Sequence, residues 1–234
     1  MKQVRNIIIP GIFVLILLIF SYGASAALTA PQETVKLVGK YYALPMGLEG
    51  SPYLFDDWLS GTIFLKNGKV ARDTRIRLDI VTDELLFYHE TLKRVFVVDK
   101  ATIDSFVVNP GRSDSMSFVK YSGEPIRFKL DSNSYIQMLY DGKRMDFFIR
   151  HKADIVKATE SNSKNKVFSR TFFYVTVNGK TEEIKPRMRS FYSVFPQKKK
   201  EIRRLVSEYK LKRSTRENMV SLIKLLDQSK EFEF

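Results

Sequence analysis

The sequence predicts a mainly β (α+β) protein, with an antiparallel, curved or meander sheet and a C-terminal two-helix hairpin packed against it. Two observations lead to this fold class. After residue 26, short segments alternate apolar and polar residues and are separated by turn residues, which is typical of strands. After Pro196, the apolar spacing changes to three and four residues, which is typical of amphipathic helices. The 18 Phe and 11 Tyr residues also favour strands.

The segment 1–26 is a predicted signal peptide. Lys2 and Arg5 give it a positive start, the apolar run 7–20 follows, and Ala-Ser-Ala at 24–26 places small residues where a signal peptidase cuts. The apolar run has 14 residues, whereas a membrane-spanning helix needs roughly 20. We therefore expect cleavage after Ala26 and export to the periplasm or cell envelope, rather than an uncleaved anchor.

The segment 27–195 is the predicted antiparallel β domain, and three dipeptides mark its hairpin turns. They are Asn-Gly at 67–68, Asp-Gly at 141–142 and Asn-Gly at 178–179. These residue types accept the two positive φ angles of a type I′ turn, which matches the twist of the flanking strands. We therefore expect a strand on each side of every one of these turns.

Alternation within the β domain predicts which side chains face water. In the segment 75–80, Arg75, Arg77 and Asp79 are expected on the wet face, and the intervening Ile and Leu residues on the buried face. Further strands are expected at 84–89, 93–98, 102–108, 117–121, 126–130, 135–140, 144–150, 169–177 and 181–184. The polar run 158–166 is expected to form a loop.

The segment 196–234 is the predicted basic helical hairpin. Four apolar residues of its first helix are spaced to share one face: Ile202, Leu205, Val206 and Tyr209. A capping box is expected before the second helix, with Ser214 as the N-cap and Glu217 at the third helical position. Four apolar residues of the second helix repeat the same spacing: Met219, Leu222, Ile223 and Leu226.

The net charge of +13 is concentrated near the C-terminus. Between Lys185 and Arg216 there are 12 Lys or Arg residues against Glu201 and Glu208, a balance of +10. Expected export makes nucleic acid an improbable partner, so we expect an anionic membrane surface, lipopolysaccharide or an acidic envelope protein. The predicted anionic-surface residues are Lys198, Lys199, Lys200, Arg203, Arg204, Lys210, Lys212 and Arg213.

An aromatic segment precedes the first long strand. Tyr53, Phe55 and Trp58 follow a turn that contains Gly50 and Pro52. These side chains form either an aromatic platform for a ligand or a plug that closes one end of the sheet. The plug is the favoured interpretation.

Few residues suggest chemistry. There is no cysteine, which excludes thiol catalysis, zinc–thiolate sites and acylation of an N-terminal cysteine. His89 and His151 are the only histidines, and no G-x-S-x-G turn is present to supply a nucleophile. The acid pairs at 56–57 and 83–84 are sequence neighbours, which do not face each other across a cleft. The sequence therefore predicts no catalytic residue, no cofactor and no metal site.

Four segments together resemble an uncharacterised secreted, β-rich envelope protein family of Gram-negative bacteria. They are G-S-P-Y-L at 50–54, D-I-V-T-D-E-L at 79–85, I-D-S-F at 103–106, and I-K-P-R at 184–187 before the basic helices. Members of that family carry a signal peptide, a β-rich body and two terminal helices. The resemblance implies location and architecture, and it implies no activity.

These observations favour a non-enzymatic binding or scaffold protein of the bacterial periplasm or cell envelope, docking to an anionic surface through its C-terminal basic helix. One alternative is a periplasmic carrier that holds a lipid or other apolar ligand in a cavity of the curved sheet. A less favoured alternative is an envelope hydrolase that depends on carboxylates.

Overall fold

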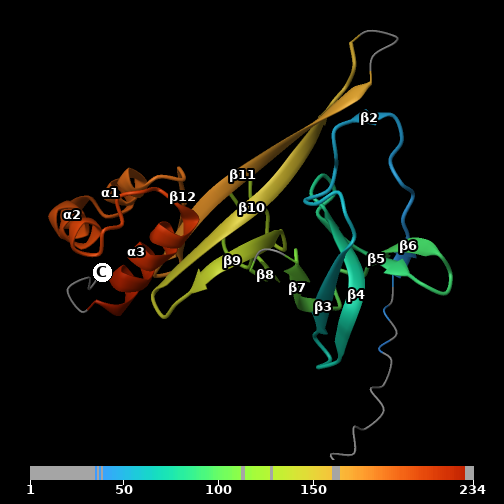
Figure 1. Ribbon diagram of the computed structural model, residues 1–234, viewed down its shortest axis with the longest axis horizontal. Helices are drawn as coiled ribbons and strands as arrows, with labels where there is room; N and C mark the ends of the chain where they lie inside the picture. The colour runs from blue at the N-terminus through green and yellow to red at the C-terminus, as the bar shows by residue number, and fades with distance from the viewer. Residues whose placement is uncertain are drawn as a thin grey trace, which may run out of the picture. The chain divides into compact units, whose positions relative to one another are not determined.

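The computed structural model describes residues 35, 37, 39–111, 114–126, 129–159 and 164–229. The predicted signal peptide lies outside these residues. The described residues are mostly β, with one mixed sheet and helices that follow it in the chain (Figure 1). This confirms the predicted fold class.

The sheet contains 12 strands within the described part of the chain. Their order is β1-β6-β5-β4-β3-β7-β8-β9-β10-β11-β12, and β2 pairs in parallel with β11. The strands are β1 (Gly39–Tyr41), β2 (Leu48–Glu49), β3 (Leu59–Leu65), β4 (Val70–Asp79), β5 (Glu84–His89), β6 (Arg94–Val98), β7 (Ile103–Asn109), β8 (Met116–Lys120), β9 (Tyr135–Asp141), β10 (Met145–Val156), β11 (Asn165–Val177) and β12 (Lys180–Ile184). Most neighbours in the chain are neighbours in the sheet, as a meander predicts, but β7 returns to pair with β3.

Three strand predictions were wrong in extent. The segment 126–130 forms only an isolated bridge between Ile126 and Leu130. The hairpin of β10 and β11 is longer than predicted, because pairing continues to Val156 and Lys166 through part of the segment that was expected to be a loop.

All three predicted turns join neighbouring antiparallel strands, but only one has the two positive φ angles of a type I′ turn. Asn178 and Gly179 have φ angles of 48° and 82°. At 67–68 only the glycine has a positive φ, and at 141–142 neither residue does. Gly142 is explained by space instead, since a Cβ there would lie 2.5 Å from a carboxylate oxygen of Asp227.

The sheet curls until β10 reaches the end of β4. The backbone N–H of Ala153 donates to the carbonyl oxygen of Ile80 at 2.8 Å, although four strands separate β4 from β10 in the sheet. The inside of this curl is filled by apolar side chains, including Ile63, Phe106 and Phe118, none of which is exposed. Burial of this core is the main stabilising contribution to the β part of the fold.

Asp79 corrects the predicted pattern of wet and buried residues. It was expected to face water, but only 1% of it is exposed. The hydroxyl of Tyr42 donates to its carboxylate at 2.6 Å, and the N–H groups of Val81 and Thr82 donate to its other oxygen. The alternation was correct for the strand, but Tyr42 comes from a distant segment and covers the polar face.

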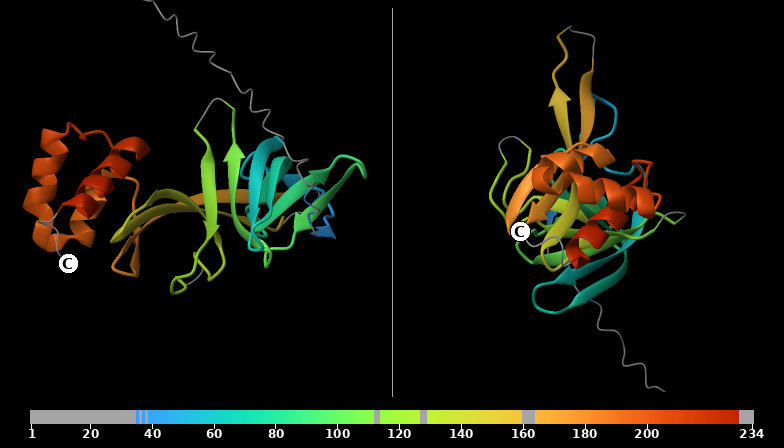
Figure 2. Two further views of the ribbon diagram at one scale, coloured as in Figure 1. Left: turned by 90° about the horizontal axis from the view of Figure 1, so that it is seen from below. Right: turned by 90° about the vertical axis from the view of Figure 1, so that its left-hand side faces the viewer.

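The helices lie beside β12, at the open end of the β10–β11 hairpin, where β10 begins and β11 ends (Figure 2). They are the 3₁₀ turns Met188–Ser190 and Pro196–Lys198 and the helices α1 (Phe191–Val194), α2 (Lys199–Glu208) and α3 (Arg216–Gln228). The helical part thus begins before Pro196. A second core joins helices to sheet through buried residues such as Phe147, Phe191 and Leu222.

Two details of the helices differ from the prediction. Thr215, not Ser214, is the N-cap of α3, and its hydroxyl accepts the N–H of Asn218 at 3.3 Å. The hydroxyl of Ser214 instead accepts the N–H of Met188 at 3.1 Å. Tyr209 lies beyond the end of α2 and is half exposed, whereas the four predicted apolar residues of α3 are buried as expected.

In the part of the chain that the structure describes, no helix combines the length and the apolar character needed to cross a membrane.

Candidate functional site

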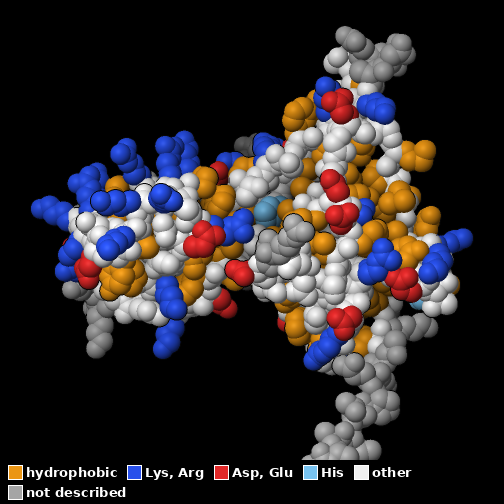
Figure 3. Space-filling model, in the orientation of Figure 1, with side chains coloured by type: hydrophobic (Ala, Val, Ile, Leu, Met, Phe, Trp, Pro, Cys, Tyr) orange, Lys and Arg blue, Asp and Glu red, His pale blue; other side chains and the backbone are white. Residues whose placement is uncertain are grey.

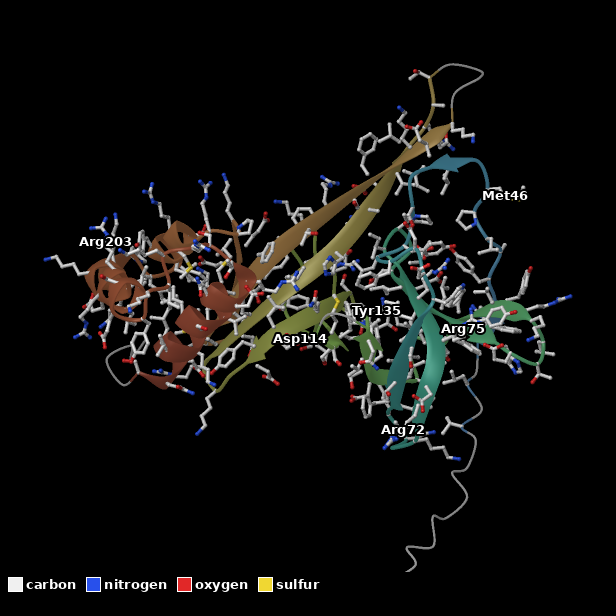
Figure 4. The ribbon with its side chains drawn as sticks, in the orientation of Figure 1. Met46, Arg72, Arg75, Asp114, Tyr135 and Arg203 are labelled. Atoms are coloured by element: carbon white, nitrogen blue, oxygen red, sulfur yellow. The ribbon has the colours of Figure 1, made fainter. Side chains whose placement is uncertain are left out.

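The basic helical face consists of the eight predicted anionic-surface residues. They are Lys198, Lys199, Lys200, Arg203, Arg204, Lys210, Lys212 and Arg213. All are exposed except Lys198, which is partly buried. Figure 3 shows Lys and Arg side chains crowded over the helical part, and Figure 4 shows Arg203 pointing away from α2. The structure therefore places the predicted residues on the outside of one region of the fold.

One side of α2 is packed against the protein, which leaves the four cations of this helix exposed: Lys199, Lys200, Arg203 and Arg204. Ile202 is fully buried, and Leu205 and Val206 pack beside it on the second core. Beside this apolar face, the Lys199 ammonium and the Arg203 guanidinium lie 5.9 and 5.5 Å from the ring of Tyr192. A cation over an aromatic ring is held in place without losing its charge. The apolar side of α2 is thus used by the protein itself, and its charged side remains available.

Lys210 occupies a backbone position that normally favours glycine. Its φ is 55°, and it follows the end of α2. Its N–H donates to the carbonyl of Ser207, and the N–H of Leu211 donates to that of Val206, which together form a Schellman motif. A lysine in this left-handed conformation costs about 1 kcal/mol relative to glycine. The chain therefore keeps a positive charge here at some expense of stability.

Further cations extend the basic surface beyond the predicted residues. Lys185, Arg187 and Arg189 are exposed and line a groove of about 400 Å³ together with Ser190 and Ser193. These three residues were counted in the positive charge between Lys185 and Arg216. They were not among the predicted anionic-surface residues, because they precede α2 and do not belong to its helical pattern. Arg216 at the start of α3 is also exposed.

The three aromatic residues of the predicted platform or plug are not brought together. The guanidinium of Arg77 lies between the rings of Tyr53 and Trp58, at 4.5 and 4.6 Å from their centres. Both rings pack against a small cluster that contains Leu86. Phe55 packs against the larger core instead. Tyr53 and Trp58 hold an arginine of β4 and cover one face of the sheet, while Phe55 serves another part of the fold.

The acid pairs lie in different settings. Asp56 and Asp57 are exposed before β3. Asp83 forms ion pairs with Lys100 and Arg150, both at 2.7 Å, and also accepts the N–H of Tyr135. The Asp83 carboxylate therefore links the β4–β5 turn to other parts of the fold.

His151 lies within β10 rather than at its end, and only 9% of it is exposed. Its Nε2 lies 2.9 Å from Oε1 of Gln137 in β9. Burial, together with the charges of Arg216 and Arg150, lowers the pKa of His151 to about 4. The ring is therefore neutral at neutral pH.

Acidification is expected to destabilise the protein through His151. Between pH 6.5 and about 4, the unfolded chain binds a proton on this histidine and the folded protein does not, so stability falls as the pH falls. The loss approaches about 3 kcal/mol when the pH reaches the folded pKa. Urea unfolding at about pH 7.5 and about pH 4.5 measures it.

Two variants test the assignment. His151→Gln should remove most of this pH dependence, and the matched change at the other histidine, His89→Gln, should leave it intact. A pH dependence that survives in His151→Gln would assign the acid sensitivity to carboxylates instead.

The alternative of a ligand carrier expected a cavity inside the curved sheet. Apolar side chains of the core occupy the inside of the curl. A groove of about 940 Å³ lies instead between the sheet and α3. Among the described residues, no group of three or more His, Asp or Glu side chains is arranged to hold a metal ion.

The fold and this surface define a β-rich protein with a basic helical region. Comparison of the chain with protein-family models, curated proteins and solved structures finds no match.

Proposed function

We propose that this protein is a non-enzymatic binding or scaffold protein of the bacterial periplasm or cell envelope, and that its basic helical face docks it to an anionic lipid surface. The observation that carries the proposal is the concentration of exposed cations on the helical region, where Ile202, Leu205 and Val206 of α2 pack in the second core. The predicted leader at 1–26 and the resemblance to a secreted envelope family support the location.

Most cations of the basic helical face have no ion-pair partner among the described residues. Within the described residues, six of its members have no carboxylate within ion-pair distance: Lys199, Lys200, Arg203, Lys210, Lys212 and Arg213. Elsewhere in the fold, exposed cations such as Arg75 and Lys166 do have acidic partners. A cluster that is left without counter-ions within the protein is suited to an anionic partner outside it.

Docking of this kind is peripheral. Each Lys or Arg near an anionic membrane contributes about 1 kcal/mol, and the attraction fades within a Debye length. Ile202 and Leu211, which would have to insert into the lipid, are buried in the second core instead. Binding should therefore depend on lipid charge and on salt.

The triple variant Lys199→Glu, Lys200→Glu, Arg203→Glu tests the proposal. Co-sedimentation with vesicles of phosphatidylcholine containing phosphatidylglycerol should fall by about a hundredfold in partition coefficient, since three cations contribute about 3 kcal/mol. Wild-type binding should vanish on vesicles of phosphatidylcholine alone and weaken when salt is raised.

Two controls distinguish binding through the basic helical face from a general effect of net charge. Reversal of three exposed cations of the β part, Lys40, Lys66 and Arg72, changes the net charge equally and should have a much smaller effect; Figure 4 labels Arg72. Lys210→Gly should weaken binding about fivefold while raising stability, because glycine relieves the positive φ. Equal losses in the two triple variants, or binding that ignores phosphatidylglycerol, would contradict the proposal.

A further inference from the structure

The groove beside α3 combines apolar walls with a polar floor. Gln137 and His151 form the floor, from β9 and β10. Met116 and Leu139 come from the sheet and Val220 comes from α3, while Asp114, which Figure 4 labels, also lines the groove. The groove of about 940 Å³ has room for a small organic molecule or a few residues of peptide.

The floor presents hydrogen-bonding atoms that the protein does not use. Gln137 is 3% exposed and His151 is 9% exposed, and one hydrogen bond of 2.9 Å joins them. Within the described residues, the second polar atom of the amide and Nδ1 of the imidazole have no hydrogen-bond partner, and both residues line the groove.

This pair offers one donor and one acceptor whichever way the amide is turned. If Gln137 accepts from Nε2 of His151, its amide nitrogen donates to the groove and Nδ1 accepts. If the amide is reversed, its oxygen accepts and Nδ1 donates, since the neutral ring carries one proton. A ligand amide, which has one N–H and one C=O, matches either arrangement.

If Gln137 and His151 served only to fill the core, apolar residues would be expected in their place. The side chains on either side of His151 on its face of β10 are Ile149 and Ala153, and both are buried and apolar. Two polar side chains with unpaired atoms at this depth reduce stability. Such residues are expected where a ligand completes the hydrogen bonds.

A cation stands at the edge of the groove. Arg216 is the first residue of α3, and it is exposed without an ion-pair partner among the described residues. It lies near enough to contribute to the lowered pKa of His151. The neighbouring carboxylate of Glu217 interacts with its own backbone N–H and with Thr215, which lowers its pKa and ties it to the helix end. The start of α3 and Arg216 together favour a ligand carboxylate.

We infer that this groove binds the chemical unit of an amide next to a carboxylate and an apolar side chain. The floor pair takes the amide, Arg216 takes the carboxylate, and the apolar walls take the side chain, with Met116 able to adapt to apolar groups of varied shape. Two sources carry this unit: a free N-acyl amino acid and the C-terminus of a peptide. This inference is independent of the proposed docking to lipid.

Nuclear magnetic resonance of the full chain tests it, because the two histidines give separate imidazole signals. Titration with N-acetyl-leucine should shift the signals of His151 and leave those of His89 unchanged. N-acetyl-leucinamide, which lacks the carboxylate, should bind at least tenfold more weakly.

Variants of the groove complete the test. Arg216→Ala and Gln137→Leu should each weaken binding of N-acetyl-leucine at least tenfold, and the matched exposed change on the same helix, Lys224→Ala, should not. Arg216 is exposed, so its variant is expected to fold even if Gln137→Leu does not.

The source of the ligand follows from an acetylated tripeptide that ends in leucine. Binding at least tenfold tighter than that of N-acetyl-leucine would assign a peptide C-terminus, and equal binding would assign the free acyl amino acid. The inference is overturned if neither N-acetyl-leucine nor the tripeptide shifts the signals of His151. It is also overturned if the Arg216→Ala protein binds N-acetyl-leucine as tightly as the wild type does and the wild type binds N-acetyl-leucinamide as tightly as N-acetyl-leucine.

Discussion

Replacing Asp83 with asparagine is expected to lower the free energy of unfolding by about 3–5 kcal/mol, because it leaves a buried guanidinium without its counter-ion. The side chain of Arg150 is only 5% exposed, and its Nη1 lies 2.7 Å from the Asp83 carboxylate. Lys100 forms a second ion pair with the same carboxylate and lies 4.1 Å from the ring centre of Tyr135. These contacts tie the β4–β5 turn to β9 and β10, where the sheet curls on itself.

The substitution is chosen to isolate charge from backbone conformation. Asp83 has a φ of 59°, which asparagine tolerates as well as aspartate does. The matched control is Asp73→Asn, at an exposed position with a φ of 49°, and its effect should stay within about 0.5 kcal/mol. Urea unfolding gives the free energies, and the melting temperature of Asp83→Asn should fall by roughly 6–20 °C.

A double variant identifies the cause of the loss. Asp83→Asn with Arg150→Met removes the carboxylate and the buried guanidinium, and it should recover much of the stability that Asp83→Asn loses, because the remaining cation, Lys100, has a side chain that is 32% exposed to water. A loss below 1 kcal/mol for Asp83→Asn would show that the ion pairs do not hold the curl together.

The strands were predictable because their signals are local. The bounds of β5 and β9 were predicted almost to the residue from turn residues beside short runs of apolar and aromatic residues, since such signals depend on a few neighbouring side chains. The return of β7 to β3 and the contact of Ala153 with Ile80 depend on distant segments, and no short pattern encodes them. Asp79 illustrates the same limit, because its burial is decided by Tyr42, 37 residues earlier in the chain.

The candidate surfaces divide in the same way. The basic helical face was predictable, because its charges are close in sequence and alternate with buried residues of α2. The groove was not, because Gln137 and His151 are 14 residues apart and meet only through the pairing of β9 with β10. Arg216 joins them from a helix more than sixty residues further along the chain.

Replacing Asp227 with alanine is expected to loosen the helical part from the sheet at a cost of about 3 kcal/mol or more. Its carboxylate is 4% exposed and accepts the hydroxyl of Tyr140 at 2.9 Å and the N–H groups of Lys143 and Arg144 at 3.0 and 2.9 Å. The Arg144 side chain in turn donates to carbonyl oxygens at the end of α3, including that of Ser229 at 2.9 Å. These contacts lower the pKa of Asp227 and join the β9–β10 turn to α3.

Hydrogen exchange distinguishes local loosening from a general loss of stability. In Asp227→Ala, the amides of α3 and of the turn at 142–144 should exchange faster by a larger factor than those of β4 and β5, because the ion pairs of Asp83 remain intact. Tyr140→Phe removes one hydrogen bond and should cost only about 1 kcal/mol, and the exposed neighbour Gln228→Ala should have no measurable effect. Uniform acceleration across the sheet and α3 would instead show that the helical part and the sheet unfold as one cooperative unit, so that the Asp227 contacts stabilise the whole fold rather than one joint within it.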